Sequence, residues 1–370
     1  MANTDWYLYN FRLSLAEFIR SNGDQLILLS PQGTYVQKLK NMGFKWIEIN
    51  LSRKGHNPFK EIATISQIAS IYRAEKPDLV HHFTVKCVIY GSLAAKLTGV
   101  KKIINAITGL GYIFLNENIK ARIIRWIVKI FYRFSLRNTM VVFQNEDDLQ
   151  LFQRNHLIIQ DQTQIVPGSG VDIDKFTPIK EPDGITSVIL IARLLRDKGI
   201  YEFVEAAKII IGQSHNVRFI LVGDIDEGNP ASLTQNELQD WLEKGVIEWW
   251  GWRDDVINVY HSANIVCLPS YREGISRTLI EAGACGKPLV TTNVPGCKQV
   301  VIDGENGFVV PQKNAEELAK ALVKLIINPK LRKVMGMRSR EIVTKTFSSS
   351  IINSQTLALY EKIKEGGINA

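Results

Sequence analysis

Short apolar runs alternate with longer segments of helical periodicity along the first 165 residues. The apolar runs have four to six residues, the length of buried strands, and the segments between them repeat apolar positions every three or four residues. This alternation is typical of a doubly wound parallel sheet. We predict strands at 25–30, 46–49, 79–83, 102–106 and 140–144, and helices at 11–21, 37–42, 59–75 and 88–98.

Residues 165–178 form a last strand and a Gly- and Pro-rich exit, and a second alternating series begins after residue 186. It predicts strands at 187–192, 217–222, 246–249, 265–268, 289–291 and 307–310, helices at 199–211, 315–327 and 329–346, and a final helix at 351–364. The chain is therefore predicted to be an α/β protein of two Rossmann-like doubly wound domains, 1–168 and 169–348, with a C-terminal segment at 349–370.

The first domain starts in an unusual way for this class of fold. A Rossmann-like domain normally opens with a strand, but only residues 1–5 precede the first predicted loop. Either the first strand is short or absent, or the chain begins at a later start than the native gene.

Composition is that of an ordinary globular protein, with 45% hydrophobic and 22% charged residues in a chain of 370. No apolar run approaches the ~20 residues of a membrane-spanning helix, and the N-terminus shows no signal-peptide pattern. The cysteines are scattered without a Cys-x-x-Cys motif: Cys87, Cys267, Cys285 and Cys297. This usage favours reduced thiols, and we expect a cytoplasmic protein.

Charge is distributed unevenly between the two halves. Residues 1–170 contain 21 Lys and Arg against 12 Asp and Glu, a net charge of +9, whereas the remaining residues carry a net charge of −1. A basic first half indicates a separate anionic partner, of which anionic lipid is one candidate. Nucleic acid is another, but the sequence contains no nucleic-acid-binding motif.

Candidate chemistry is concentrated at residues 271–290. An apolar strand at 265–268 leads into this segment, and a short helix is predicted from about Ile275 to Gly286, with Pro288 just beyond. Glu273 and Gly274 would lie at the open N-terminus of this helix, where amide groups attract an anion. Glu281 would follow on the second turn, so the pattern is that of a sugar-nucleotide site.

The spacing of these residues carries a family resemblance. Glu-x7-Glu followed by Ala-x3-Gly-x-Pro resembles the donor signature of retaining glycosyltransferases of family GT4, which have the GT-B fold. The segments at 189–199, 219–224 and 304–310 resemble further family elements in the family's order. The resemblance implies two domains facing across a cleft and a C-terminal helix that crosses back to the first domain. Residues 5–12 and 108–112 look most like bacterial members that extend polysaccharide or lipid-linked oligosaccharide chains.

The resemblance also implies roles for the donor site. Arg193 and Lys198 would clasp the donor diphosphate, and Glu273 would bind sugar hydroxyls. Amides at the helix start would meet phosphate or sugar, and Glu281 would hold the ribose hydroxyls. The donor-binding set is Gly274, Ile275, Ser276, Glu281, Ser169, Trp252 and Arg253. The alternatives are solvated loop cations, a plain helix cap and rim packing for Trp252.

Two Asp-x-Asp strings raise the question of a metal ion. Asp172–Asp174 and Asp224–Asp226 each follow a predicted strand in a turn-rich segment, where aspartate is common for backbone reasons. Because Arg193 and Lys198 can stabilise the departing diphosphate, we expect neither a metal nor another cofactor, with the nucleotide sugar acting as substrate.

Candidates on the acceptor side come from strand ends and loops of the first domain. They are Lys86, His81, His82, Gly109, Gly111, Asn10 and Arg12. One of the two histidines must point inward on a regular strand, so a buried core histidine is the alternative to a ligand-binding one. Asn10 can cap the first helix, and Arg12 could meet an anion.

Residues 119–138 form a basic amphipathic segment, with lysines and arginines at three- and four-residue steps beside a broad apolar face. Such a helix can lie on an anionic membrane, or it can simply cover its own domain.

These features together predict a retaining transferase that moves a hexosyl group from a UDP-hexose to a polyprenyl-linked or growing polysaccharide acceptor. The expected location is the cytoplasm, with peripheral contact at the inner face of the plasma membrane. A UDP-sugar epimerase or hydrolase of the same fold and a non-catalytic sugar-nucleotide-binding module are the alternatives.

Overall fold

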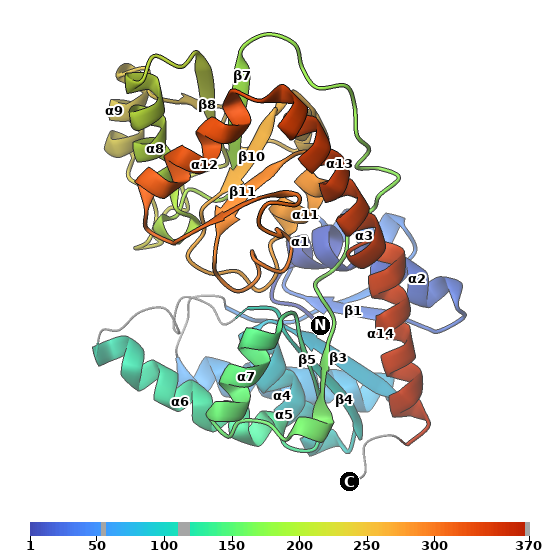
Figure 1. Cartoon of the computed structure of the whole chain (residues 1–370). Helices are drawn as coiled ribbons and strands as arrows, with labels where there is room; N and C mark the ends of the chain where they lie inside the picture. Colours follow the sequence, from blue (N-terminus) through green and yellow to red (C-terminus); the bar gives the residue numbers. More distant parts are fainter. Residues whose placement is uncertain (53–56, 110–118, 367–370) are drawn as a thin grey trace. The chain divides into compact units, whose positions relative to one another are not determined.

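The computed structural model describes residues 1–52, 57–109 and 119–366, and the chain divides into two units (Figure 1). Unit 1 comprises Met1–Ser169 and Ile352–Ala370, and unit 2 comprises Gly170–Ile351. The sequence places the corresponding boundaries after residues 168 and 348. Among the described residues, no helix is both long enough and apolar enough to cross a membrane.

Unit 1 contains two parallel sheets. A four-stranded sheet has the order β3 (Leu79–Phe83), β4 (Lys102–Ile107), β5 (Met140–Phe143) and β6 (Thr163–Ile165), and a separate pair consists of β1 (Ile27–Ser30) and β2 (Lys45–Glu48). Every residue of β5 is buried, as expected for a strand covered on both faces.

The helices of unit 1 follow local end signals. Asn57 caps α4 and Pro58 occupies its first turn, while Gly99 ends α5 in a left-handed conformation. The helical segments are α1 (Asp5–Tyr7), the π-helical turn η1 (Leu8–Arg12), α2 (Leu13–Ser21), α3 (Val36–Asn41), α4 (Pro58–Glu75), α5 (Val85–Thr98), α6 (Ile119–Leu136), α7 (Glu146–Arg154) and α14 (Ser349–Lys364).

Helix α14 packs on the core of unit 1, although it comes last in the chain. Ile352, Leu359 and Ile363 share a buried cluster with Leu15 and Ile19 of α2. Polar contacts fix both ends of this packing: Asn353 donates to Ser14 Oγ at 2.9 Å, and Lys364 pairs with Asp24 at 2.9 Å.

Unit 2 is built on one six-stranded parallel sheet, in the order β12-β11-β10-β7-β8-β9. Its strands are β7 (Thr186–Ile191), β8 (Val217–Val222), β9 (Glu248–Trp249), β10 (Ile265–Leu268), β11 (Leu289–Thr292) and β12 (Gly307–Val310). Its helices are α8 (Ile200–Gly212), α9 (Gln235–Glu243), α10 (Val256–Ser262), α11 (Arg277–Ala284), α12 (Ala315–Ile326) and α13 (Pro329–Thr346).

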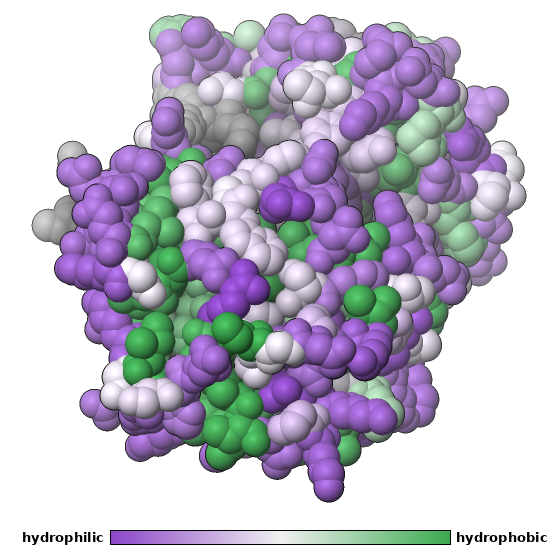
Figure 2. Space-filling model, turned by 90° about the horizontal axis from the view of Figure 1, so that it is seen from above, coloured by the Kyte–Doolittle hydropathy of each residue, from purple (hydrophilic) through white to green (hydrophobic). Residues whose placement is uncertain are grey.

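Successive residues of the central strands of unit 2 face opposite layers. Val188 and Leu190 pack with α8 and α12, whereas Ile189 packs with α10 and α11. Both faces of the sheet are therefore covered, and the carboxyl ends of the strands are left to carry the site. The face seen in Figure 2 is largely hydrophilic, with smaller groups of hydrophobic residues between the polar ones.

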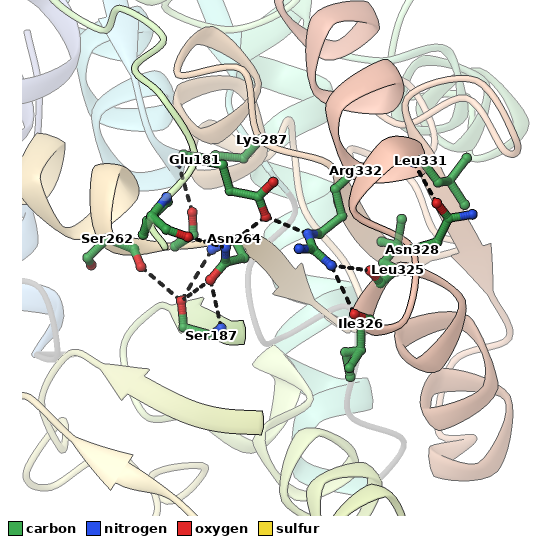
Figure 3. Close-up of polar contacts among 12 residues, drawn as sticks. Glu181, Ser187, Ser262, Asn264, Lys287, Leu325, Ile326, Asn328, Leu331 and Arg332 are labelled. Atoms are coloured by element: carbon green, nitrogen blue, oxygen red, sulfur yellow. Dashed lines mark hydrogen bonds and ion pairs between the residues drawn. The ribbon is translucent and has the colours of Figure 1, made fainter. Parts of the chain in front are cut away.

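The first segment of unit 2, before β7, is tied to the rest of the unit by a partly buried polar network (Figure 3). Glu181 accepts hydrogen bonds from Asn264 at 2.7 Å and from Arg332 at 2.5 Å. Arg332 also donates to the carbonyls of Leu325 and Ile326 at the end of α12, which lack partners within the helix. These bonds, with that from Asn264 to the Pro182 carbonyl, hold residues 181 and 182 to unit 2.

Most predicted elements agree with the structure within two or three residues, and the predicted α/β class is confirmed. The predicted strand at 246–249 is shortened to Glu248–Trp249, and the sequence prediction omits α7, α9 and α10. At the N-terminus, no regular strand precedes α1 among the described residues.

His82 belongs to the core of unit 1, which corrects its prediction as a cleft residue. Its side chain is fully buried, and its ring nitrogens contact the Tyr72 hydroxyl at 2.8 Å and Asn105 Oδ1 at 2.9 Å. Asn105 in turn donates to Thr139 on the neighbouring segment. Burial lowers the pKa of His82 to about 3 because the charged imidazolium is poorly solvated there.

This burial predicts that unit 1 loses stability in mild acid. The unfolded chain takes up a proton on His82 below its ordinary pKa of 6.5, whereas the folded chain does not until about 3. Stability contributed by the neutral histidine is therefore present above pH 6.5 and lost as the pH falls, by roughly 2 kcal/mol between about pH 7.5 and 5. Urea unfolding at a series of pH values measures this slope.

The variant His82→Gln provides the comparison, because it cannot titrate. Its unfolding free energy should vary less with pH than that of the wild type over the same interval. Equal slopes in the two proteins would contradict the assignment of this acid sensitivity to His82.

Candidate functional site

Two loops at the carboxyl edge of the unit 2 sheet are held against each other. One follows β7 and carries Arg193 and Lys198, and the other follows β10 and carries Glu273. The Asp197 carbonyl accepts from the Tyr271 amide at 2.8 Å and from Ser270 Oγ at 3.0 Å. These bonds hold the two loops against each other and bring their charged side chains together.

Gly199 allows this close approach. A Cβ atom at this position would lie 2.0 Å from the Pro269 carbonyl oxygen, and its φ of +74° lies in the left-handed region. Only glycine meets both requirements without strain. The glycine that precedes α8 thus positions the β7 loop against the β10 loop.

Lys198 and Glu273 form the central ion pair of the site. Lys198 Nζ lies 2.6 Å from Glu273 Oε1, and the two side chains are only 18% and 16% exposed. Burial opposes the charged form of the lysine, but the Glu273 carboxylate outweighs it and raises the pKa of Lys198. The lysine is therefore a fixed cation at neutral pH.

The turn at Pro295–Gly296 holds the segment that leads into α11. The Glu273 amide donates to the Pro295 carbonyl at 3.1 Å, and the Ser276 amide donates to the Gly296 carbonyl at 2.8 Å. Ser276 Oγ caps the helix by accepting from the Leu279 amide. The predicted use of the Ser276 amide for a ligand is thus corrected, because that amide already has a partner within the protein. Ligand roles for Gly274 and Ile275 stay predictions.

Glu281 lies on α11 with both carboxylate oxygens held in place. Tyr260 donates its hydroxyl to Oε2 at 2.9 Å, and Arg277, one turn earlier on the helix, donates to Oε1 at 2.6 Å. The residue is 8% exposed. Burial and the adjacent Glu281 carboxylate raise the pKa of Tyr260, so its hydroxyl stays a donor.

Arg193 is more open to solvent than Lys198. Its side chain is 58% exposed and forms an ion pair with Asp226 at 2.9 Å. The preceding aspartate, Asp224, accepts from the Trp252 amide at 3.0 Å, and its carbonyl accepts from the Leu194 amide at 2.9 Å. The second Asp-x-Asp string therefore connects the loops that follow β7, β8 and β9.

The first Asp-x-Asp string forms a local turn. Asp172 Oδ1 accepts from the amides of Asp174 and Lys175 at 3.0 and 3.1 Å, as an Asx-turn does. Within the part of the chain that the structure describes, no three His, Cys, Asp or Glu side chains are grouped as metal ligands. Metal independence stays a prediction.

Trp252 and Arg253 follow β9 at the same edge. The Trp252 side chain is 55% exposed, whereas Arg253 makes a bidentate ion pair with Asp255 at 2.7 and 2.6 Å. The guanidinium lowers the pKa of Asp255 to about 2. Trp252 is thus free of packing on much of its surface, and Arg253 has a local partner.

Arg12 and His81 come together in unit 1. Arg12 is buried, lies 4.1 Å above the centre of the Phe83 ring and donates to the Tyr7 hydroxyl at 2.9 Å. His81 Nδ1 contacts the Tyr360 hydroxyl at 2.6 Å. Burial, reinforced by the nearby Arg12 cation, lowers the pKa of His81, so the ring is neutral.

Other predicted residues of unit 1 have contacts within the protein. Lys86 donates to Glu61 Oε1 at 2.7 Å and to the Ser52 carbonyl at 2.9 Å. Asn10 lies inside the π-helical turn η1 and donates to the Trp6 carbonyl, so its prediction as the first helix cap is wrong. Thr4 is the cap, and its hydroxyl accepts from the Tyr7 amide.

The remaining predicted residues stay untested. Gly109 follows β4 with a φ of +125°, and Gly111 lies outside the described residues. Ser169 is the last residue of unit 1 before the division, and a role at the donor site stays a prediction.

The two units match sequence models of glycosyltransferases. Residues 172–342 match the group described as "Glycosyl transferases group 1", and residues 1–145 match "Glycosyl transferase 4-like". The chain belongs to the GT4-type glycosyltransferases.

Two relatives align with most of the chain. It is 28% identical to the N,N'-diacetylbacillosaminyl-diphospho-undecaprenol alpha-1,3-N-acetylgalactosaminyltransferase of Campylobacter jejuni, over 96% of each protein. It is 25% identical to the UDP-Gal:alpha-D-GlcNAc-diphosphoundecaprenol alpha-1,3-galactosyltransferase of Escherichia coli, over 78% of this chain and 76% of that one.

Solved structures give the fold. The structure of Anabaena Alr3699/HepE in complex with UDP aligns with a TM-score of 0.78 at 16% identity, and the alignment covers 98% of each chain. This likeness confirms the predicted GT-B fold with two Rossmann-like units.

Sequence reasoning missed the residues that support the predicted ones. Arg277 and Tyr260 orient Glu281, and Gly296 supports Glu273. The i, i+4 spacing of Arg277 and Glu281 could have indicated the first contact. The other two contacts join segments that are far apart in the sequence, and no local pattern indicates them.

The role of Gly296 generates a prediction. Its φ is +77°, and a Cβ atom there would lie 2.6 Å from the Glu273 backbone, whereas Gly304 has the same φ with nothing within 4 Å. Gly304→Ala should cost about 1 kcal/mol of unfolding free energy from the left-handed backbone alone. Gly296→Ala should cost roughly 3 kcal/mol, because Glu273 must also shift. Urea unfolding of the two variants measures the difference, and equal costs would show that the turn does not support Glu273.

Proposed function

We propose that the protein transfers a hexosyl group, with retention of anomeric configuration, from a UDP-hexose to a polyprenyl-diphosphate-linked or growing polysaccharide acceptor. The observation that carries this proposal is the buried Lys198–Glu273 pair, which joins the loops that follow β7 and β10. The relatives from Campylobacter jejuni and Escherichia coli, whose names specify diphospho-undecaprenol-linked sugars, support the acceptor class. The solved Anabaena complex with UDP supports the donor class.

The chemistry requires charge stabilisation at the departing diphosphate. As the bond between the anomeric carbon and the phosphate oxygen breaks, negative charge grows on the diphosphate, and fixed cations lower the barrier. Lys198 would supply a compact buried charge. Arg193 would supply a more exposed guanidinium group that exchanges its contact with Asp226 for phosphate. Because these cations serve the role, the proposed reaction uses no metal ion.

Glu273 and Glu281 would bind hydroxyl groups of the donor. Glu273 lies beside Lys198, to which it is hydrogen-bonded. It would therefore contact the sugar while Lys198 contacts the phosphate. Glu281 receives two hydrogen bonds from Tyr260 and Arg277, which leaves lone pairs on both oxygens for ribose hydroxyls. Its rigid orientation suits a role in positioning.

Retention fits a front-face route. The acceptor oxygen would attack the anomeric carbon on the face from which the diphosphate departs, and its proton would pass to a phosphate oxygen of the leaving group. One carbon–oxygen bond forms as one breaks, and no protein nucleophile is needed. Glu273 would stabilise positive charge on the sugar in the transition state.

The test is turnover of Lys198→Ala and Glu281→Ala with a UDP-hexose and a polyprenyl-diphosphate-sugar acceptor, in the presence of excess EDTA. Each variant should lose roughly 100-fold to 1000-fold in kcat/KM. Lys208→Ala is the matched control, because that lysine pairs with Glu205 on the exposed face of α8, and it should retain wild-type turnover.

Three outcomes would contradict the assignment. Wild-type rates in Lys198→Ala or Glu281→Ala would remove the proposed site. Release of UDP or a new sugar from the donor alone, at the full rate, would indicate a hydrolase or epimerase. Complete loss of activity in EDTA, restored by a divalent ion, would contradict the metal-free route.

We also propose that α6 contacts an anionic membrane at the inner face of the plasma membrane. Tyr132 and Leu136 pack into the core, while the opposite side of the helix exposes large apolar side chains among arginines. Trp126 and Phe134 are each 64% exposed, and Phe131 is 45% exposed. Basic and apolar groups on one exposed face suit a lipid surface better than water.

This proposal predicts binding to vesicles of anionic phospholipid and weak binding to neutral ones. Replacing Arg122 and Arg133 by Ser should weaken binding roughly 30-fold, since each basic residue near such a surface contributes about 1 kcal/mol. Vesicle co-sedimentation measures the partition. The control is the double variant Phe59→Ser and Ile62→Ser, which removes exposed apolar side chains from α4. Equal losses in both variants, or none in either, would contradict a specific role for α6.

A further inference from the structure

Tyr260 is a core tyrosine of unit 2 whose hydroxyl contacts a carboxylate of the candidate site. Its side chain is fully buried on α10, and its ring packs edge-on against Phe176, with 6.2 Å between the ring centroids. The hydroxyl donates to Glu281 Oε2 at 2.9 Å. Because core packing holds the ring in one place, it also fixes the point from which the hydroxyl donates.

The backbone of Glu281 is held independently of this bond. Thr278, on the same helix, donates its hydroxyl to the carbonyl of Ile191, at the end of β7, at 3.2 Å. Gly283 lies so close to α13 that a Cβ atom there would be 2.8 Å from Cγ2 of Val343. Helix α11 is thus held between the sheet and α13, and the side-chain torsions of Glu281 are what remains to be set.

Two hydrogen bonds set the orientation of the Glu281 carboxylate. Arg277, one turn earlier on α11, donates to Oε1 at 2.6 Å, whereas Tyr260 donates to Oε2 from a different helix. A carboxylate that is held through one oxygen can turn about that contact, but one that is held through both oxygens has a fixed plane. Each oxygen keeps a second lone pair, so the carboxylate offers two acceptors in a fixed orientation.

Two acceptors side by side suit a pair of hydroxyl groups on neighbouring carbons. The 2′ and 3′ hydroxyls of ribose are such a pair, because they lie on the same face of the ring and can each donate to one carboxylate oxygen. A 2′-deoxyribose has only one of them, and one oxygen would lose its ligand partner. Sites built to bind a hydroxyl group strongly reject ligands that lack it.

Given the proposed binding of ribose hydroxyls by Glu281, we propose that Tyr260 sets the selectivity of the site for ribonucleoside diphosphates over their deoxy counterparts. It does so by holding Glu281 Oε2 where the second ribose hydroxyl donates. Because its side chain is fully buried, Tyr260 acts through Glu281 and is a positioning residue. The donors of this protein are then sugar nucleotides built on ribose, and those built on 2′-deoxyribose are rejected.

A structural role for the same bond would have a different effect. If the bond only joined α10 to α11, its removal would weaken the binding of all nucleotides alike, because the site as a whole would loosen. If it sets the Glu281 oxygens, its removal acts only on nucleotides that carry both hydroxyls. The ratio of the dissociation constants of two such nucleotides therefore separates the two roles.

The experiment measures binding of UDP and 2′,3′-dideoxy-UDP to the full chain by isothermal titration calorimetry, with the weaker ligand measured by displacement. The wild type should bind UDP roughly 100-fold more tightly, since each hydrogen bond to the carboxylate accounts for about tenfold. In Tyr260→Phe the preference should fall to roughly tenfold, because one oxygen is no longer held in place. The affinity for 2′,3′-dideoxy-UDP should stay within about twofold of the wild-type value, which also shows that the variant is folded.

Tyr201→Phe is the matched control. Tyr201 also donates its hydroxyl to a glutamate of unit 2, Glu237, at 2.7 Å. This variant should keep the wild-type affinity for both nucleotides, and a loss of preference in it equal to that in Tyr260→Phe would contradict a specific role for Tyr260.

Glu281→Ala separates this selectivity from the proposed function. It should lose nearly all preference for UDP, and an undiminished preference would overturn the proposed contact of Glu281 with ribose. If Glu281→Ala loses the preference but Tyr260→Phe keeps it, the selectivity role of Tyr260 is wrong and the proposed function stands. Equal weakening of both nucleotides in Tyr260→Phe would likewise reduce Tyr260 to a structural residue.

Discussion

The charged site of unit 2 depends on loops that approach each other at backbone distance. The β10 loop rests on the β7 loop at Gly199, and the Pro295–Gly296 turn supports it from the other side. Side chains cannot separate these segments, so the positions of Lys198 and Glu273 follow from the sheet itself. A site built on strand ends in this way needs little reorganisation when charge develops on a ligand.

The cations of this site are paired with carboxylates of the protein. Lys198 pairs with Glu273, and Arg193 pairs with Asp226. A buried unpaired lysine would cost several kcal/mol, so the carboxylates keep the loops folded when no anion is present. In the proposed reaction, the donor diphosphate would take over the two cations, because it carries more charge and more acceptor oxygens than one carboxylate. The carboxylates would then accept hydrogen bonds from hydroxyl groups of the donor, so the proposed site would use the same side chains with and without the donor.

The sequence predicts the strands, the site-bearing helix and the family, because each depends on a local pattern. The helix at α11 follows from an apolar strand, a polar turn and the Gly286–Pro288 stop, although Ser276 rather than Ile275 sets its start. The short helix α9 could also have been found, since Thr234 and Glu237 form a capping box. By contrast, the choice of His82 over His81 as the core residue depends on Asn105 in the next strand, and the support of Glu273 by Gly296 depends on the path of a later loop. Contacts of this kind are set by tertiary packing, which no window of the sequence contains.

The sheets of the two units differ in their continuity. In unit 2, six strands form one sheet, and both faces are closed by helices. In unit 1, β1 and β2 form one sheet and β3 to β6 form another, and a cavity of about 450 Å³ is lined by residues of β1 and β3. Arg12, His81 and Tyr360 line this cavity, and burial lowers the pKa of His81. Arg12 and His81 therefore lie beside the division between two sheets, whereas the loops that carry Lys198 and Glu273 follow strands of one continuous sheet.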